Sequence, residues 1–243
     1  MSTTLGFIGS GLVGGTLARL ATAAGADVVL SNSRGPETLA GFVAELGAHA
    51  RAATGEEAAR ADVVVVSVPL TAYSRLPAEA LAGRTVIDTT NYYPDRDGRF
   101  PELDSGELTS SGLLQRTLPR SSVVKAFNNV FYRQLLTLAR PAGSPDRSAL
   151  PVADDDAAAK REVARLVDVL GYDAVDTGGL SASWRSEPTT PVYVTPYLGP
   201  APADLASADF MAWLGKTDGV PVPKSQVDTL VASAVRGPAG GRV

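Results

Sequence analysis

Hydrophobic positions follow two alternating spacings from residue 5 to about residue 177. Short runs rich in Val, Ile and Phe predict buried strands, because parallel strands covered on both faces are apolar throughout. These runs lie at residues 5–9, 27–30, 62–69, 85–89, 122–127 and 149–153, with a weaker one at 174–176. Between them, apolar residues at helical spacing predict helices over residues 12–24, 36–46 and 156–170. Strands that alternate with helices indicate an α/β fold, a doubly wound and mostly parallel sheet with helices on both faces.

The helix predicted over residues 156–170 has the clearest ends. Asp154, Asp155 and Asp156 precede its first turn, and Gly171 follows its last. Carboxylates stabilise a helix N-terminus, and glycine suits a left-handed cap at the other end. We therefore expect the acidic triplet to cap this helix rather than to bind a metal ion.

The pattern changes beyond Gly178. Prolines interrupt this part of the chain at positions 188, 191, 196, 200, 202, 221 and 223. Two stretches, residues 203–214 and 225–235, retain helical spacing. We expect residues 1–180 to form the α/β domain and residues 181–243 to form a short proline-rich carboxy-terminal appendage, whose tail at 237–243 is expected to be mobile.

The strongest chemical signal is the segment Gly9-Ser10-Gly11-Leu12-Val13-Gly14. It follows an apolar strand and opens an apolar helix, which is the context of the Rossmann dinucleotide-binding fingerprint. In that fingerprint Gly9 permits the tight turn, Gly11 lets a pyrophosphate approach the backbone, and Gly14 allows helix and strand to pack closely. Free amide groups at the helix start provide the anion site. The alternative, a packing turn without a ligand, stays open.

The end of the second strand indicates which dinucleotide binds. A site for NAD usually has Asp or Glu here, to bond the ribose 2′-hydroxyl. This chain has Asn32, Ser33 and Arg34 instead, with no acid before Glu37. A guanidinium and neighbouring polar groups bond a 2′-phosphate directly, whereas a carboxylate would repel it. The sequence therefore favours NADP(H), with Arg34 as the phosphate clamp, unless Arg34 is merely a solvated loop residue.

Three further loops follow strands at the edge where open α/β sheets bind their ligands. The first contains Val68, Pro69 and Leu70. The second contains Asn91, which either bonds the ligand or satisfies its own turn. The third contains Ala126, Asn128, Asn129 and Val130. Adjacent asparagines would be costly if buried and unpaired, so they either form a turn or contact a ligand, and we favour contact.

Composition narrows the function classes. The 243 residues include no cysteine and one histidine, His49. These counts exclude disulfides, thiolate metal sites, cysteine nucleophiles and multi-histidine metal sites, and we expect no metal. A formal net charge of −4 argues against a nucleic-acid partner. The longest strongly apolar run, residues 63–66, is too short to span a membrane, and no amino-terminal signal is recognisable, so we expect a cytoplasmic protein without a membrane partner.

With these segments in place, the chain resembles the NADP oxidoreductase, coenzyme F420-dependent family. The resemblance depends on residues 9–14, 32–35, 68–70 and 124–128, and it extends from about residue 5 to residue 187. The dinucleotide fold is also similar to that of STEAP-type metalloreductases. The resemblance implies an NADPH-dependent oxidoreductase that transfers hydride between NADP(H) and a second bound acceptor, a deazaflavin of the coenzyme F420 type.

The resemblance also implies roles for groups of residues, but it assigns no catalytic residue. The pyrophosphate loop maps to Ser10, Gly11, Leu12 and Val13, within the fingerprint bounded by Gly9 and Gly14. The 2′-phosphate site maps to Asn32, Ser33 and Arg34. The wall of the ligand crevice maps to Val68, Pro69 and Leu70. The nicotinamide neighbourhood maps to Asn91, Ala126, Asn128, Asn129 and Val130.

Two regions depart from the family pattern. Its members usually end soon after the Glu187-Pro188 segment in an apolar helix that helps dimerisation, whereas here residues 192–243 are longer and broken by prolines. The crossover at residues 92–119 is also longer than a minimal one. The second substrate would contact such regions, so the residues indicate the cofactor more firmly than the acceptor. A homodimer is consistent with the resemblance, although no residue pattern points to one.

Other enzyme classes fit the residues less well. None of the seven tyrosines has a lysine four positions later, as a short-chain dehydrogenase requires. Only about sixty residues follow Gly179, too few for the long helical domain of β-hydroxyacid-type dehydrogenases and imine reductases. A reductase of a small carbonyl or imine remains the alternative, as does an NADPH-binding sensor without turnover. A carbonyl reductase would need a proton donor, and the candidates near the crevice are Tyr92, Tyr93, Tyr132 and Lys125.

Overall fold

The computed structural model describes residues 3–202 and 204–241. A six-stranded parallel sheet dominates it, in the order β3-β2-β1-β4-β5-β6. The strands are β1 (Thr4–Ile8), β2 (Asp27–Ser31), β3 (Ala50–Ala52), β4 (Val63–Val66), β5 (Thr85–Asp88) and β6 (Ser122–Lys125). The strand order reverses between β1 and β4, which places the ligand-binding edge of a doubly wound fold above those strands. The predicted Rossmann-type fold is confirmed.

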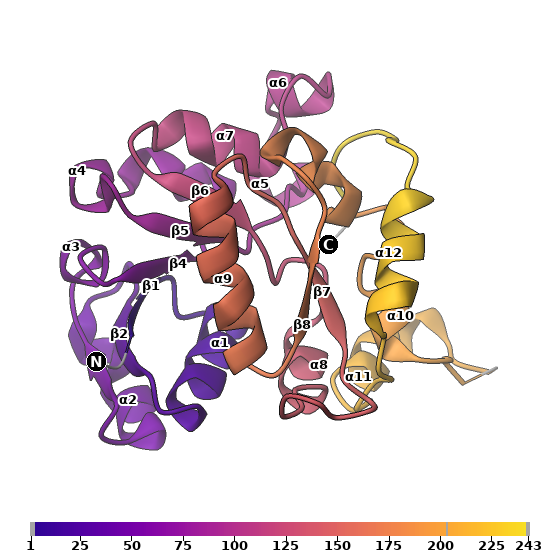
Figure 1. Cartoon of the computed structure of the whole chain (residues 1–243), viewed down its shortest axis with the longest axis horizontal. Helices are drawn as coiled ribbons and strands as arrows, with labels where there is room; N and C mark the ends of the chain where they lie inside the picture. The colour runs from indigo at the N-terminus through magenta and orange to yellow at the C-terminus, as the bar shows by residue number, and fades with distance from the viewer. Residues whose placement is uncertain (1–2, 203, 242–243) are drawn as a thin grey trace.

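Helices cover both faces of this sheet (Figure 1). The first face packs against α1 (Leu12–Ala23), α8 (Tyr132–Thr137) and α9 (Ala157–Val169). The opposite face packs against α3 (Gly55–Ala58), α4 (Ala78–Leu81) and α7 (Ser110–Thr117). All four residues of β4 are valines buried on both faces, as expected for a central parallel strand.

Local sequence accounts for two differences from the predicted elements. The short strand β3 was not predicted, because Ala50, Arg51 and Ala52 include no large apolar side chain. The helix predicted over 36–46 is divided into a 3₁₀ turn, η1 (Pro36–Leu39), and the helix α2 (Ala40–Leu46). Proline suits the first position of such a turn, because the N–H group that proline lacks would have no hydrogen-bond partner there.

A second, smaller sheet adjoins β6. Strands β7 (Ala149–Val152) and β8 (Asp173–Asp176) pair in parallel, and α9 connects them. A single antiparallel bridge joins Lys125 to Ala153, with backbone hydrogen bonds of 2.8 and 3.1 Å. The predicted capping of α9 is confirmed for Asp156, whose side chain accepts hydrogen bonds from the amides of Ala158 and Ala159, whereas the Asp155 carboxylate accepts from the amide of Leu180. Gly171 follows the helix at a φ of 99°.

The carboxy-terminal region packs into the same core. It contains η3 (Leu180–Ser186), α10 (Thr195–Leu198), η4 (Ser207–Asp209), α11 (Phe210–Leu214) and α12 (Lys224–Ala232). Helix α12 lies beside β7 and β8, and its Val227 is buried in the main cluster. The helix expected at 203–214 is a 3₁₀ turn, η4, followed by the short helix α11, and residue 203 lies outside the described residues. The domain boundary at residue 180 stays a prediction.

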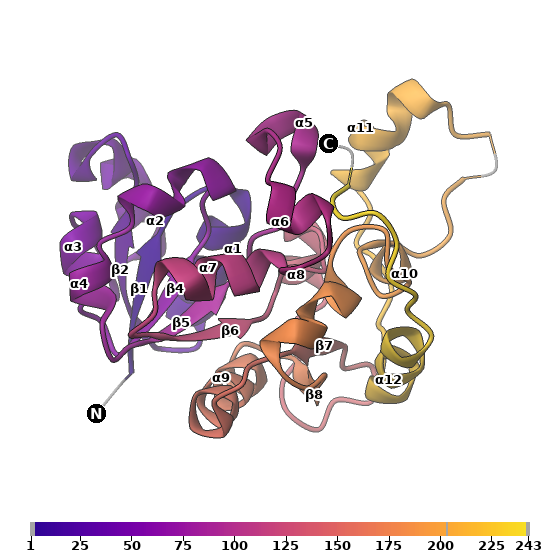
Figure 2. The same ribbon diagram turned by 90° about the horizontal axis from the view of Figure 1, so that it is seen from above.

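The crossover between β5 and β6 contains two further short helices, α5 (Pro94–Asp97) and α6 (Pro101–Asp104). Figure 2 shows α5 beside the last described part of the chain, where the amide of Gly241 donates to the carbonyl of Tyr92. The tail expected to be mobile, residues 237–243, is described as far as residue 241, and residues 242 and 243 lie outside the described residues. Among the described residues, no helix has the length and apolar character needed to cross a membrane.

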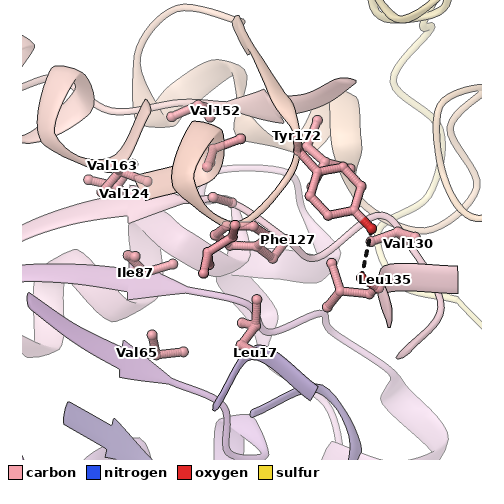
Figure 3. Packing of buried hydrophobic residues seen from close by; sticks show 14 of the residues in the cluster. Leu17, Val65, Ile87, Val124, Phe127, Val130, Leu135, Val152, Val163 and Tyr172 are labelled. Carbon is pink, nitrogen blue, oxygen red and sulfur yellow. Dashed lines mark hydrogen bonds between the residues drawn. The ribbon is translucent and has the colours of Figure 1, made fainter. Parts of the chain in front are cut away.

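The turn after β6 shows how the core positions the ligand-binding edge. Phe127 points into the cluster between Leu17, Val130 and Val163 (Figure 3). Its φ of 60° lies in the left-handed region, which a bulky residue adopts only where packing compensates the cost. The buried ring therefore holds the chain in a sharp turn, and the polar residues Asn128 and Asn129 follow at the strand end.

Candidate functional site

The glycine-rich turn between β1 and α1 has no space for side chains at two of its positions. Gly9 has a φ of 101°, and a Cβ there would lie 2.2 Å from the carbonyl oxygen of Ser67. A Cβ on Gly14 would lie 2.2 Å from the carbonyl oxygen of Gly9. Only glycine allows this close approach of strand, turn and helix. The structure thus reproduces the geometry expected for the first and last glycines of the fingerprint.

The middle of the same turn is open. A Cβ on Gly11 would meet nothing within 4 Å, and the neighbouring Leu12 is 65% exposed. Among the described residues, no side chain caps the start of α1, so its first-turn amides lack a side-chain partner. The Ser10 side chain, in contrast, bonds to the protein, because its hydroxyl donates a hydrogen bond to the carbonyl of Ser31 at 2.8 Å. The open backbone and the helix dipole together form an anion-binding surface.

The end of β2 presents a free cation. Asn32 accepts a hydrogen bond from the amide of Arg34 at 2.9 Å and donates to Thr38 at 2.9 Å, so it shapes the loop. The Arg34 side chain is exposed, and in the described part of the chain its guanidinium has no hydrogen bond or ion pair. Ser33 is exposed as well, and Ser31 is buried with its hydroxyl on the carbonyl of Phe7. The fork of Arg34 is therefore available to an anionic ligand.

The ends of β5 and β6 are built differently, around a buried ion pair. Asp88 ends β5 and Lys125 ends β6, with 3.4 Å between the carboxylate and the ammonium group and almost no exposure of either. Lys125 also donates to Ser110 at 2.9 Å and to the carbonyl of Thr90. Ser110 in turn donates to the carboxylate of Glu187 at 2.7 Å.

The remaining bonds of Asp88 connect it to two other elements. One carboxylate oxygen accepts from the amide and hydroxyl of Thr90, and the other accepts from Ser111 at 2.6 Å. Thr90 also bonds the hydroxyl of Tyr73, whose pKa burial raises well above its usual value. The network thus joins the segment after β4, the ends of β5 and β6, and helix α7. Charged residues at the ends of apolar runs were the available sequence signal, but Asp88 and Glu187 were not predicted.

The asparagines at these strand ends bond to the protein itself. Asn91 and Asn128 pair reciprocally, at 2.8 Å to the Asn128 carbonyl and 3.0 Å between the side chains. Asn128 also donates to the carbonyl of Ser186 at 2.8 Å. Asn129 is fully buried and donates to the carbonyl of Val192 and to the hydroxyl of Tyr197. These side chains fasten the carboxy-terminal region to the strand ends.

The other predicted site residues occupy the same edge of the sheet. Val68 is half-buried, Pro69 is exposed and Leu70 is buried after β4, and the half-buried Val13 lies in the first turn of α1. Ala126 and Val130 are buried, so they can present little more than backbone. The structure therefore gathers all the predicted segments at one edge, but it exposes mainly those of β1, β2 and β4.

The four candidate proton donors have different surroundings. Tyr92 is buried with its hydroxyl on Asp104 at 2.9 Å, and Lys125 belongs to the buried network. The ring of Tyr132 lies 4.5 Å from that of Phe131. Tyr93 is half-buried and bonds the hydroxyl of Tyr193. Of the four, Tyr93 is the one whose hydroxyl meets another hydroxyl at a partly accessible position.

Comparisons with known proteins agree with the family resemblance that the sequence predicts. Residues 4–92 match the family described as NADP oxidoreductase, coenzyme F420-dependent. A hypothetical protein of Sinorhizobium meliloti superimposes with a TM-score of 0.69 and 29% identity, over 79% of this chain and 93% of the other. A proposed F420-dependent NADP reductase of Arthrobacter sp. FB24 gives a TM-score of 0.62 and 28% identity, over 75% and 87%.

Two further relatives share only the fold or match only a short segment of the chain. A reductive aminase of Aspergillus terreus shares the fold at a TM-score of 0.52 and 17% identity, over 76% of this chain and 59% of the other. The Escherichia coli protein YjhV is 43% identical over 53 residues, which is 22% of this chain and 39% of that protein. The chain thus matches about two fifths of that curated relative. Together, the comparisons confirm the predicted resemblance to the NADP oxidoreductase, coenzyme F420-dependent family.

Proposed function

We propose that this chain transfers hydride between NADP(H) and a deazaflavin acceptor of the coenzyme F420 type. The observation that carries the proposal is the free guanidinium of Arg34 at a strand end that lacks the acid typical of NAD sites. The family match over residues 4–92 and the F420-dependent activity proposed for the Arthrobacter protein support the same acceptor.

The residues present fit a bound NADP(H). The open backbone at Gly11 and the uncapped start of α1 suit the pyrophosphate, and Ser33 and Arg34 suit the 2′-phosphate. Val68 and Pro69 provide an apolar wall beside them. When bound, the nicotinamide supplies a hydride at its C4 atom.

The β5 and β6 loops contribute shape rather than acid–base chemistry. Asn91, Asn128 and the buried Lys125–Asp88 pair make their hydrogen bonds within the protein, so they hold the backbone that would face a nicotinamide. Rigid positioning of two planar rings and exclusion of water are what hydride transfer requires of a protein. No general acid is needed within these loops.

Two measurements test the proposal. Calorimetric titration is expected to show much tighter binding of NADPH than of NADH, and equal affinities would refute the assignment of the 2′-phosphate site. NADPH oxidation is then followed by absorbance with a deazaflavin and with a panel of small carbonyls and imines. Turnover with the panel alone would assign the enzyme to the carbonyl or imine reductases, and binding without any turnover would make it a sensor.

A further inference from the structure

A pair of tyrosine hydroxyls lies at the ligand-binding edge, and the proposed nucleotide site does not use it. Tyr93 comes from the loop after β5, and Tyr193 comes from the carboxy-terminal region, 100 residues later. Their hydroxyls bond each other, and both side chains are half-buried. The segment that carries Tyr193 lies in the part of the chain that departs from the family pattern.

Two sets of hydrogen bonds hold this pair next to the predicted nicotinamide neighbourhood. Tyr93 lies two residues after Asn91, which pairs with Asn128. Tyr193 directly precedes Val194, whose amide donates to the carbonyl of Asn129 at 2.8 Å. The segments that carry the two tyrosines are therefore bonded, through Asn91 and Val194, to the two adjacent asparagines after β6.

The backbone around Tyr193 adopts an unfavourable conformation to reach this position. Thr189 has a φ of 75° and Val194 has a φ of 54°, both in the left-handed region that β-branched residues rarely enter. Such conformations persist only where surrounding contacts compensate for them, and they are concentrated at functional sites. Here the side chains of Asn128 and Asn129 donate to the carbonyls of Ser186 and Val192, which hold the segment on both sides of Thr189.

The hydrogen bonds of the pair leave one donor unused. Two hydroxyls bring two protons, and the bond between them uses one. Within residues 3–202 and 204–241, neither hydroxyl has another hydrogen-bond partner. Burial is the main cause of the raised pKa of Tyr193, so its hydroxyl remains protonated at neutral pH. The Arg96 guanidinium lies 4.8 Å from the centre of the Tyr93 ring and fixes that ring from one side.

We propose that the Tyr93–Tyr193 pair binds the hydride acceptor by donating a hydrogen bond to a carbonyl or imide oxygen of a planar ring. This inference rests on the proposed function, because it assumes that the acceptor lies beside the nicotinamide end of the nucleotide. The pair orients the acceptor and stays neutral throughout. An imide-bearing ring such as a deazaflavin has the oxygen atoms that this donor requires.

Binding of 8-hydroxy-5-deazariboflavin tests the inference without relying on turnover. Its fluorescence is titrated with protein saturated with NADP⁺, using wild type, Tyr93→Phe, Tyr193→Phe and the double variant. We expect the double variant to bind the probe about tenfold more weakly, the usual effect of one hydrogen bond of about 1.4 kcal/mol. NADPH affinity is expected to stay unchanged in all three variants.

Tyr92→Phe is the matched control, because it removes an adjacent hydroxyl that bonds Asp104 instead. It is expected to bind the probe like wild type, and circular dichroism checks that each variant is folded. Equal probe affinity of wild type and a folded double variant would overturn the inference. Wild type that binds NADPH but not the probe would overturn it too and leave the nucleotide site standing, whereas failure to bind NADPH would overturn the proposed function itself.

Discussion

At the carboxyl edge of the sheet, polar groups are exposed at the β1–β2 end and buried at the β5–β6 end. At the β1–β2 end, defined by residues 9–14 and 31–34, Gly11 is open and the Arg34 guanidinium has no partner among the described residues. At the β5–β6 end, defined by residues 88–91 and 125–130, Asp88 and Lys125 are buried and bonded within the protein. Both ends have polar residues after apolar strands, yet only the first leaves its groups available to a ligand.

The difference follows from the cost of burying charge. Asp88 and Lys125 have left water, so each needs a full set of protein partners. Arg34 remains in water, and a phosphate can replace that water with charge-assisted hydrogen bonds. A ligand-binding end is thus expected to tolerate loss of its side chains without unfolding, whereas the closed end should not.

The largest expected effect is on the closed end. Lys125→Met removes the cation that faces Asp88 and, through Ser110, Glu187. Two carboxylates then remain in the interior with fewer donors, so we expect a loss of about 3–5 kcal/mol in the free energy of unfolding, measured by urea denaturation. The double variant Lys125→Met/Asp88→Asn is expected to recover part of it. A loss below about 1 kcal/mol in Lys125→Met would mean that the buried pair is not a structural requirement.

The next effect concerns the open end and leaves stability unchanged. Arg34→Ala is expected to weaken NADPH binding by about 1.5–3 kcal/mol, at least tenfold, because a charge-assisted hydrogen bond is lost. NADH binding should not change, since NADH has no 2′-phosphate. Arg60→Ala is the matched control, because Arg60 is 68% exposed and precedes β4 at the opposite edge of the sheet. Equal losses for both nucleotides in Arg34→Ala would contradict the clamp.

Open and closed positions also occur side by side within the glycine turn of the β1–β2 end, at Gly11 and Gly14. Gly14→Ala places a Cβ 2.2 Å from a backbone oxygen, so we expect it to destabilise the fold by about 1–3 kcal/mol. Gly11→Ala meets nothing within 4 Å, so its stability should stay within about 0.5 kcal/mol of wild type. Its NADPH affinity should fall, because the new methyl group occupies the approach of the pyrophosphate. Thermal unfolding and NADPH titration measure the two effects separately, and wild-type nucleotide affinity in Gly11→Ala would argue against this approach.

These contrasts also show which parts of the molecule could be predicted from the sequence. The Val-rich strands and the glycine turn were predictable, because local pattern and local backbone geometry determine them. The sequence could not show whether Asn128 and Asn129 face a ligand or the protein, because their partners Ser186 and Val192 lie some sixty residues away along the chain. The position of Tyr193 depends on the same contacts. The short strand β3 was missed because Ala50, Arg51 and Ala52 pair with β2 without an apolar pattern.

Asp154, at the end of β7, combines features of both ends and gives the smallest expected effect. It is 3% exposed, one carboxylate oxygen accepts from the amide of Asp156 at 3.1 Å, and the other has no partner within the described residues. Burial, with a smaller contribution from Asp155 and Asp156, raises its pKa from 3.8 to about 6. The folded state therefore holds a proton between these two pH values that the unfolded state releases, so stability falls as pH rises through this window.

Asp154→Asn removes the charge and retains an oxygen that can accept from Asp156. We expect the variant to be more stable than wild type by about 1 kcal/mol at pH 7, less than the whole pKa shift represents, because the new amide must itself be solvated or paired. The advantage should shrink as pH falls and disappear near pH 4, where wild-type Asp154 is protonated in the folded state. Urea denaturation at several pH values measures this difference. A stability difference that does not change with pH would show that the unpaired oxygen of Asp154 reaches water. Burial without a protein partner would then not be enough to distinguish a structural carboxylate from one that binds a ligand.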